Sequence, residues 1–280
     1  MTGSKRKVRV RVKMKVQNSK IIIALIYIFI NLFISLSSLA YAETNSPSSS
    51  RLFKWMTKKI VVTQTKKFPK YKLKLQFPVF VSDKIDQQQL DKANKTIKEI
   101  VLTNRSEFIE YTTNYRRDPT LPLEKQHIYY LENDYEVMVP TKSLASVRLN
   151  FENGGGGDHY LYPVEIINVQ FNPFKIITIE NLFDRNITKK ALSALSSYAR
   201  KKLKIIIPNS SYKGVYDRIH RGTGPTFENF EHVAISEKGL LIIFPPEDVA
   251  CYGDGTLEVL VPWREIPFKV QIPLRLNQVK

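Results

Sequence analysis

The stretch SEKGLLIIFPPEDVACYGDGTLEVLVPWREI, residues 236–266, decides the fold expected of this chain. The apolar run from Gly239 to Phe244 predicts a buried strand, and Pro245 and Pro246 end it because proline cannot donate to a strand ladder. Residues 247–256 contain the glycine and aspartate that favour turns. Residues 257–262 then alternate apolar and polar side chains, as a second strand does. The stretch therefore predicts two strands joined by a loop.

Outward from this pair, apolar alternation predicts further strands, and two longer segments show the spacing of helices. We expect principal helices at about 83–115 and 189–205, each with one apolar stripe. The strands are expected at 70–77, 77–81, 127–131, 135–139, 143–151, 160–171, 176–179 and 232–235. A polar loop is expected before residue 232. The fold class is therefore α+β, an antiparallel sheet packed against two principal helices.

The positive charge of the chain lies at its N-terminus. The sequence has 43 Lys and Arg against 26 Asp and Glu, a net charge of +17. Residues 1–42 contribute +8, residues 43–74 another +8, and residues 75–280 only +1. Because the expected globular part is close to neutral, we do not expect nucleic acid as a partner.

The first 42 residues have the composition of an export signal. A basic segment up to Lys20 precedes an apolar run, and Ala40-Tyr-Ala42 fits a small-residue cleavage site. We therefore expect a cleaved signal and a periplasmic or extracellular protein. The alternative is an inner-membrane anchor formed by residues 21–39. With Cys251 as the sole cysteine, the chain forms no internal disulfide.

The second basic segment, from Arg51 to Lys74, mixes lysines with aromatic side chains. Such a segment could contact an anionic membrane surface. Its last part, 70–74, alternates as a half-buried edge strand with a lysine face does, and we favour that interpretation there. The expected organisation is a signal or anchor at 1–42, a basic linker at 43–70, an N-terminal α+β half at 71–150, a C-terminal α+β half at 151–267, and a tail at 268–280.

Several motifs resemble a domain of unknown function found in exported bacterial proteins. They are Gly156-Gly-Asp-His159, Ile179-Glu-Asn-Leu-Phe183, and a later signature at Gly239, Leu240, Ile242, Phe244, Pro246, Ala250, Gly255, Val259, Val261, Pro262 and Trp263. This domain occurs in the extracytoplasmic part of RsiV-type anti-sigma factors and in the non-catalytic N-terminal region of PdaC-type peptidoglycan deacetylases. The resemblance covers about 71–267.

The resemblance implies an envelope domain that binds something, and in the anti-sigma relatives the partner is lysozyme. The chain departs from the pattern at Cys251, where the family more often has tyrosine. Neither the deacetylase domain nor a cytoplasmic sigma-binding segment is recognisable. Deacetylation and sigma regulation are therefore not carried over.

Residues with reactive side chains do not form a recognisable catalytic motif. Cys251 has no base at a motif spacing, and the four histidines lack the spacing of metal ligands. The acids Glu247, Asp248, Asp254 and Glu258 could perform glycoside hydrolysis only if held about 5–10 Å apart, and in a loop they are more often solvated. We expect neither a cofactor nor a metal.

The sequence thus predicts a non-enzymatic envelope domain that binds a cell-wall polymer or a protein partner, lysozyme being one candidate. The residues expected to make contact are Asp158, His159, Tyr160, Glu247, Asp248, Tyr252, Asp254 and Trp263, with Tyr162 a further exposed aromatic candidate. One alternative is an envelope-polymer hydrolase that uses Cys251 or the loop carboxylates. Another is a membrane-anchored sensor.

Overall fold

The fold comes from a computed structural model, which describes residues 56–67, 70–114, 128–154, 161–207 and 214–272. All of these belong to one compact unit that begins at Ser50. Within these ranges no helix is long and apolar enough to cross a bilayer. The predicted leader lies outside the described residues.

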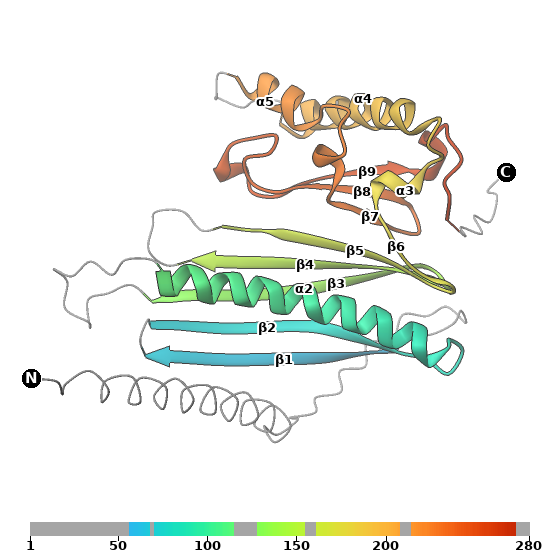
Figure 1. The fold of residues 1–280 in the computed structure, drawn as a ribbon. Helices are drawn as coiled ribbons and strands as arrows, with labels where there is room; N and C mark the ends of the chain where they lie inside the picture. The colour runs from blue at the N-terminus through green and yellow to red at the C-terminus, as the bar shows by residue number, and fades with distance from the viewer. Residues whose placement is uncertain (1–55, 68–69, 115–127, 155–160, 208–213, 273–280) are drawn as a thin grey trace, which may run out of the picture. The chain divides into compact units, whose positions relative to one another are not determined.

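A six-stranded sheet forms the first layer, with its strands side by side in chain order (Figure 1). The strands are β1 (Met56–Lys67), β2 (Lys70–Val81), β3 (Tyr129–Thr141), β4 (Leu144–Gly154), β5 (Val164–Phe171) and β6 (Phe174–Ile177). Four of the neighbouring pairs are antiparallel, but β2 and β3 are parallel. Parallel neighbours need a long crossover, and helix α2 (Gln87–Asn114) supplies it.

Helix α2 covers one face of this sheet because its apolar residues recur every three or four positions (Figure 1). Its buried stripe includes Leu90, Ala93, Ile97, Val101 and Phe108, and it joins the buried face of β2 in one core. Two edge-to-face aromatic pairs lie in this core, one between β2 and α2 and one between β2 and β5. The Tyr71 and Phe108 rings lie 5.8 Å apart, and the Phe80 and Phe171 rings 5.2 Å apart.

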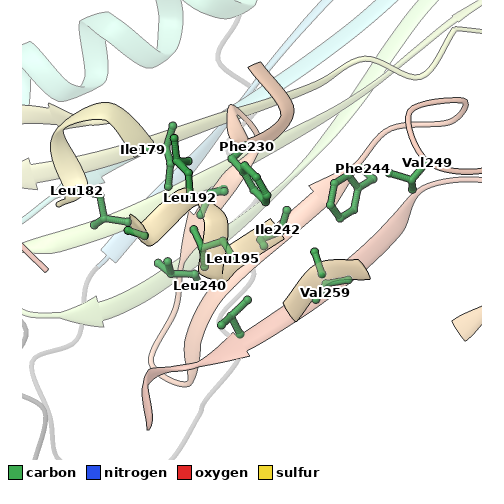
Figure 2. Packing of buried hydrophobic residues seen from close by; sticks show 14 of the residues in the cluster. Ile179, Leu182, Leu192, Leu195, Phe230, Leu240, Ile242, Phe244, Val249 and Val259 are labelled. Atoms are coloured by element: carbon green, nitrogen blue, oxygen red, sulfur yellow. The ribbon is translucent and has the colours of Figure 1, made fainter. Parts of the chain in front are cut away.

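A second layer contains a three-stranded antiparallel sheet and the helices α3, α4 and α5. The strands are β7 (Val233–Ile235), β8 (Gly239–Phe244) and β9 (Leu257–Pro262), and the α-helices are α3 (Ile179–Leu182), α4 (Thr188–Ile206) and α5 (Val215–Gly222). Helix α4 turns Leu192 and Leu195 toward Leu240 and Ile242 of β8, as Figure 2 shows. The apolar run 239–244 is buried because it lies between β7 and β9 and under this helix.

Strand β4 is buried on both faces because helix α2 covers one face of its sheet and the second layer covers the other. Ala145, Val147 and Leu149 face the core under α2. The alternate residues Ser146 and Arg148 face the second layer, as the period of two in a strand requires. Both are buried, so the two layers meet across a polar seam.

Side chains in the seam form hydrogen bonds with the backbone groups on the free edge of β7. In the β7–β8 ladder the hydrogen-bonded positions are those of Ser236 and His232, so the backbone groups of Ile235 point away from β8. The Ile235 N–H instead donates to Ser146 Oγ at 3.0 Å and to Asn168 Oδ1 at 3.1 Å. Asn168 Nδ2 donates to Val233 O at 2.8 Å. Two side chains of the large sheet therefore take the place of a neighbouring strand.

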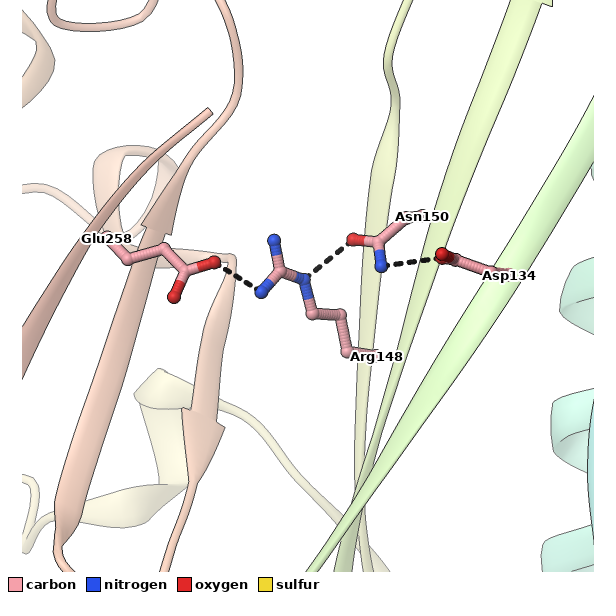
Figure 3. A network of polar contacts seen from close by, with 4 residues as sticks. All are labelled: Asp134, Arg148, Asn150 and Glu258. Atoms are coloured by element: carbon pink, nitrogen blue, oxygen red, sulfur yellow. Dashed lines mark hydrogen bonds and ion pairs between the residues drawn. The ribbon is translucent and has the colours of Figure 1, made fainter. Parts of the chain in front are cut away.

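A second polar tie joins β4 to β9 (Figure 3). Arg148 donates from Nη1 to Glu258 Oε1 at 2.5 Å and from Nε to Asn150 Oδ1 at 2.6 Å. Asn150 Nδ2 in turn donates to Asp134 Oδ1 at 2.8 Å. The Arg148 side chain is 11% exposed, whereas that of Glu258 is 43% exposed. This Arg148 network therefore closes the seam on its solvent side.

The α+β class and both principal helices are confirmed, since α2 and α4 lie at the predicted positions. Other details differ. The strands expected at 70–77 and 77–81 are one strand, β2, and the β2–β3 pair makes the large sheet mixed and not purely antiparallel. Residues 56–67 form β1 and not a linker, so 70–74 is an inner strand and not an edge. The segments 127–131 and 135–139 are one strand, β3, and helix α5 occupies part of the predicted loop. The predicted boundary at residue 150 falls inside β4.

Candidate binding surface

The loop between β8 and β9, residues 245–256, carries four of the eight predicted contact residues, Glu247, Asp248, Tyr252 and Asp254. A side chain of helix α5 donates hydrogen bonds to backbone carbonyls of the loop. Arg218 Nη1 donates to Ala250 O at 2.9 Å and to Glu247 O at 3.3 Å. A Cβ atom on Gly222 would lie only 2.1 Å from Asp248 O, so glycine is required for this close approach.

Glu247 has a left-handed backbone conformation, with φ of 76°. This region costs a residue with a Cβ atom about 1–2 kcal/mol. The two hydrogen bonds from Arg218 stabilise the turn in which Glu247 sits. The side chain of Glu247 is exposed. The fold therefore holds an acidic side chain out into solvent at a conformational cost.

Asp254 and Cys251 have a structural role in the same loop. The Cys251 N–H donates to Asp254 Oδ2 at 2.9 Å, which closes the short helix η3 (Tyr252–Asp254). Cys251 is a half-buried free thiol. The Asp254 carboxylate is exposed and keeps further lone pairs for a partner.

A neighbouring acid, Glu231, makes this surface more negative. Partial burial raises the pKa of the Asp248 carboxyl, and the charge of Glu231 raises it further. Burial lowers the pKa of His232, and Glu231 Oε1, 3.3 Å from His232 Nε2, opposes that shift. The pKa of Glu165 on β5 is also raised, first by burial and then by Glu231. Glu231 thus acts electrostatically on both the loop and strand β5 of the large sheet.

Two tyrosines lie beside these acids. The ring centroids of Tyr162, which precedes β5, and Tyr252 of η3 are 6.1 Å apart, with a tilt of 37° between the planes. Both rings are half-buried. We call Tyr162, Tyr252, Glu231, Glu247, Asp248 and Asp254 the acidic–aromatic surface.

The structure divides the predicted contact residues into three groups. Glu247, Asp248, Tyr252 and Asp254 lie together in the loop. Trp263 lies beyond the other end of β9, about 20 Å away by strand length, and its Nε1 donates to Ser236 O and Glu237 O, both at 3.1 Å. Its indole N–H therefore serves the β7–β8 turn, and Trp263 does not join the loop. Asp158, His159 and Tyr160 lie outside the described residues.

Sequence reasoning missed Glu231, 17 positions before Asp248, and Arg218, 29 positions before Glu247. The predicted acid Glu258 is not a loop residue, because it pairs with Arg148 in the seam. No signal in the local sequence indicates either outcome, since both depend on which segments pack together.

The acidic–aromatic surface offers exposed carboxylates and two tyrosine rings to a partner. Among the described residues, no group of His, Cys, Asp or Glu has an arrangement that could hold a metal ion. A small hollow lies between α4 and residues 265–268, lined mostly by apolar side chains such as Phe183 and Phe268. None of the predicted contact residues lines it.

Comparison with known proteins supports a family of unknown function for part of the chain. A family model described as "Protein of unknown function (DUF3298)" matches residues 180–264. A solved DUF3298 family member from Bacteroides fragilis NCTC 9343 is 15% identical, with 78% of this chain and 94% of that chain covered and a TM-score of 0.49. A DUF3298 family protein from Pseudomonas aeruginosa PAO1 is 10% identical, with 78% and 93% covered and a TM-score of 0.49.

No curated protein matches the chain. The expected resemblance to a domain of unknown function is confirmed for residues 180–264, which include the loop and the strands on either side of it. The resemblance to RsiV-type and PdaC-type proteins stays a prediction.

Proposed function

Because residues 180–264 match a family without an assigned activity, we propose a function from the surface itself. We propose that this chain is an exported, non-enzymatic envelope protein that binds a positively charged protein partner through the acidic–aromatic surface. The observation that carries the proposal is the gathering of four carboxylates and two tyrosines on one loop and its neighbours.

The composition of this surface suits a protein interface. Tyrosines are enriched at the centre of such interfaces, where their rings bury apolar area and their hydroxyls keep a polar partner. Carboxylates around them select a partner of opposite charge and speed the encounter. Glu247, Asp248 and Asp254 are exposed, so they can meet a partner with little rearrangement.

Export supports the choice of partner. We place the protein in the envelope because residues 1–42 have the pattern of an export signal. The resemblance to RsiV-type proteins makes lysozyme the first partner to test. Lysozymes are basic proteins. The basic segment 51–74 repels such a partner, so the acidic–aromatic surface must supply the attraction.

The test is a binding titration of the chain against lysozyme and, in parallel, against insoluble peptidoglycan. The variant is Glu247→Lys/Asp248→Lys. The matched control is Glu237→Lys/Glu265→Lys, which changes the charge equally at two exposed acids near Trp263. We expect lysozyme binding that the first variant abolishes and the control retains.

Each other outcome counts against part of the proposal. Binding to peptidoglycan alone would replace the protein partner by a wall polymer. If both variants retain lysozyme binding, the acidic–aromatic surface is not the binding site. Release of muropeptides by the wild type, lost in Cys251→Ala, would establish the hydrolase alternative.

A further inference from the structure

The charged residues on the outward face of α4 are all cations. Its sequence, TKKALSALSSYARKKLKII, has six basic residues and no acidic one. The buried stripe, which includes Leu192, Leu195, Ala199 and Leu203, faces the core of the second layer. The exposed lysines are Lys189, Lys190, Lys201, Lys202 and Lys204. This distribution leaves one side of the helix strongly positive although residues 75–280 together are close to neutral.

The C-terminal end of α4 adds apolar side chains to this charge. Ile205 is 63% exposed and Ile206 48% exposed, and Tyr216 at the start of α5 is 50% exposed. The Lys204 Nζ atom lies 5.6 Å from the Tyr216 ring centroid, so these two side chains lie together where α4 and α5 approach each other. We call Lys201, Lys202, Lys204, Ile205, Ile206 and Tyr216 the basic–apolar patch.

We propose that the basic–apolar patch docks this domain on the surface of a bilayer that contains anionic phospholipid. Lysines near such a surface are attracted by about 1 kcal/mol each, which is about fivefold in affinity. Binding is stabilised when isoleucine side chains leave water for the boundary between head groups and acyl chains. Tyrosine is favoured at the same depth.

The two isoleucines decide between a bilayer and a soluble polyanion. A polyanion in water would neutralise the lysines but would leave Ile205 and Ile206 exposed to solvent. A bilayer surface takes up both kinds of side chain at once. The patch shares no residue with the acidic–aromatic surface, so the two proposals stand or fall separately.

The test reads contact at α4 itself, because the leader and the basic segment 51–74 could also bring the full chain to a vesicle. In a Cys251→Ser background, Ser197→Cys carries an environment-sensitive fluorophore on the outward face of α4. Ser106→Cys on α2 is the matched control. Both serines are exposed and donate to the carbonyl four residues earlier, at 3.0 Å and 2.8 Å.

With vesicles that contain phosphatidylglycerol, the label at residue 197 should shift to the blue and be quenched by lipids brominated near the head group. Neither effect is expected with phosphatidylcholine alone, or at residue 106. Lys201→Gln/Lys202→Gln/Lys204→Gln should raise the half-maximal phosphatidylglycerol concentration about 100-fold, from three fivefold steps. The equal change Lys92→Gln/Lys95→Gln/Lys98→Gln on α2 should raise it less than threefold.

Three results would overturn the proposal. The first is a label at residue 197 that does not respond to phosphatidylglycerol vesicles. The second is an equal loss in the α2 control variant, which would show that only net charge matters. The third is a response to soluble polyphosphate but not to vesicles, which would identify the partner as an anionic polymer.

Discussion

The edge of β7 provides a prediction whose size and sign follow from the geometry. Asn168 makes four polar contacts in the seam, to Val233 O, Ile177 O, Ile235 N and Ser146 Oγ. Leucine branches at Cγ as asparagine does, but it can form none of these hydrogen bonds. Asn168→Leu therefore leaves Val233 O and Ile177 O without the amide. At about 1–3 kcal/mol for each buried polar group left unpaired, the cost should be about 3 kcal/mol.

Ser146→Ala should cost less, about 1–2 kcal/mol, because only Ile235 O loses its donor while the Ile235 N–H keeps its bond to Asn168 Oδ1. The double variant should cost more than the sum of the two. Each single variant leaves Ile235 N–H one acceptor, whereas the double variant leaves it none. The excess should be about 1–3 kcal/mol, the cost of one unpaired buried N–H group.

The assay is urea unfolding followed by circular dichroism, with thermal unfolding in parallel. A loss of 3 kcal/mol corresponds to a fall of about 9 °C in Tm for a domain of this size. Gln170→Leu, on the same strand and face but partly exposed, is the control and should change stability by less than about 0.5 kcal/mol. A cost below 1 kcal/mol for Asn168→Leu, or strictly additive variants, would refute the view that these side chains cap β7.

Three further predictions concern the loop. Gly222→Ala places a methyl group 2.1 Å from Asp248 O and should lower the free energy of unfolding by about 1–3 kcal/mol, and unchanged urea unfolding would contradict the packing of α5 on the loop. Asp248→Asn should stabilise the protein more at pH 7 than at pH 4. A carboxyl whose pKa is raised in the folded state makes the protein less stable as the pH rises through that value, so equal effects in urea at both pH values would contradict the raised pKa of Asp248. Glu247→Gly should raise the free energy of unfolding by about 0.5–1 kcal/mol, because relief of the left-handed backbone exceeds the entropy that glycine adds to the unfolded chain. Glu247→Gly should also weaken binding of a basic partner. A lower free energy of unfolding for Glu247→Gly would exclude backbone strain at residue 247.

Much of the fold follows from local patterns in the sequence. The stripes of α2 and α4 and the strands β8 and β9 are recognisable because each buries one face, or both, against a single core. Strand β1 is not recognisable, since its central Ile60, Val61 and Val62 are flanked by exposed lysines and threonines. Its identity depends on pairing with β2. The parallel β2–β3 pair likewise depends on where α2 returns the chain.

The contact residues were predictable only within the loop. Glu247, Asp248, Tyr252 and Asp254 lie within eight positions of one another, so any closed β8–β9 pair brings them together. Trp263 is excluded because a strand of six residues separates it from the loop. Glu231 and Arg218 reach the loop because distant helices and strands pack beside it. Glu258 does not belong to the acidic–aromatic surface, because Arg148, far away in the sequence, pairs with it across the seam.

The central claim is attraction between the acidic–aromatic surface and a basic partner. Its most direct measurement is the dissociation constant for lysozyme at 50 mM and 300 mM salt, with Glu247→Gln/Asp248→Asn beside the wild type. The account predicts wild-type binding that weakens at high salt and a variant with weaker binding and a smaller salt dependence. Equal affinities for the two proteins at both salt concentrations would contradict it.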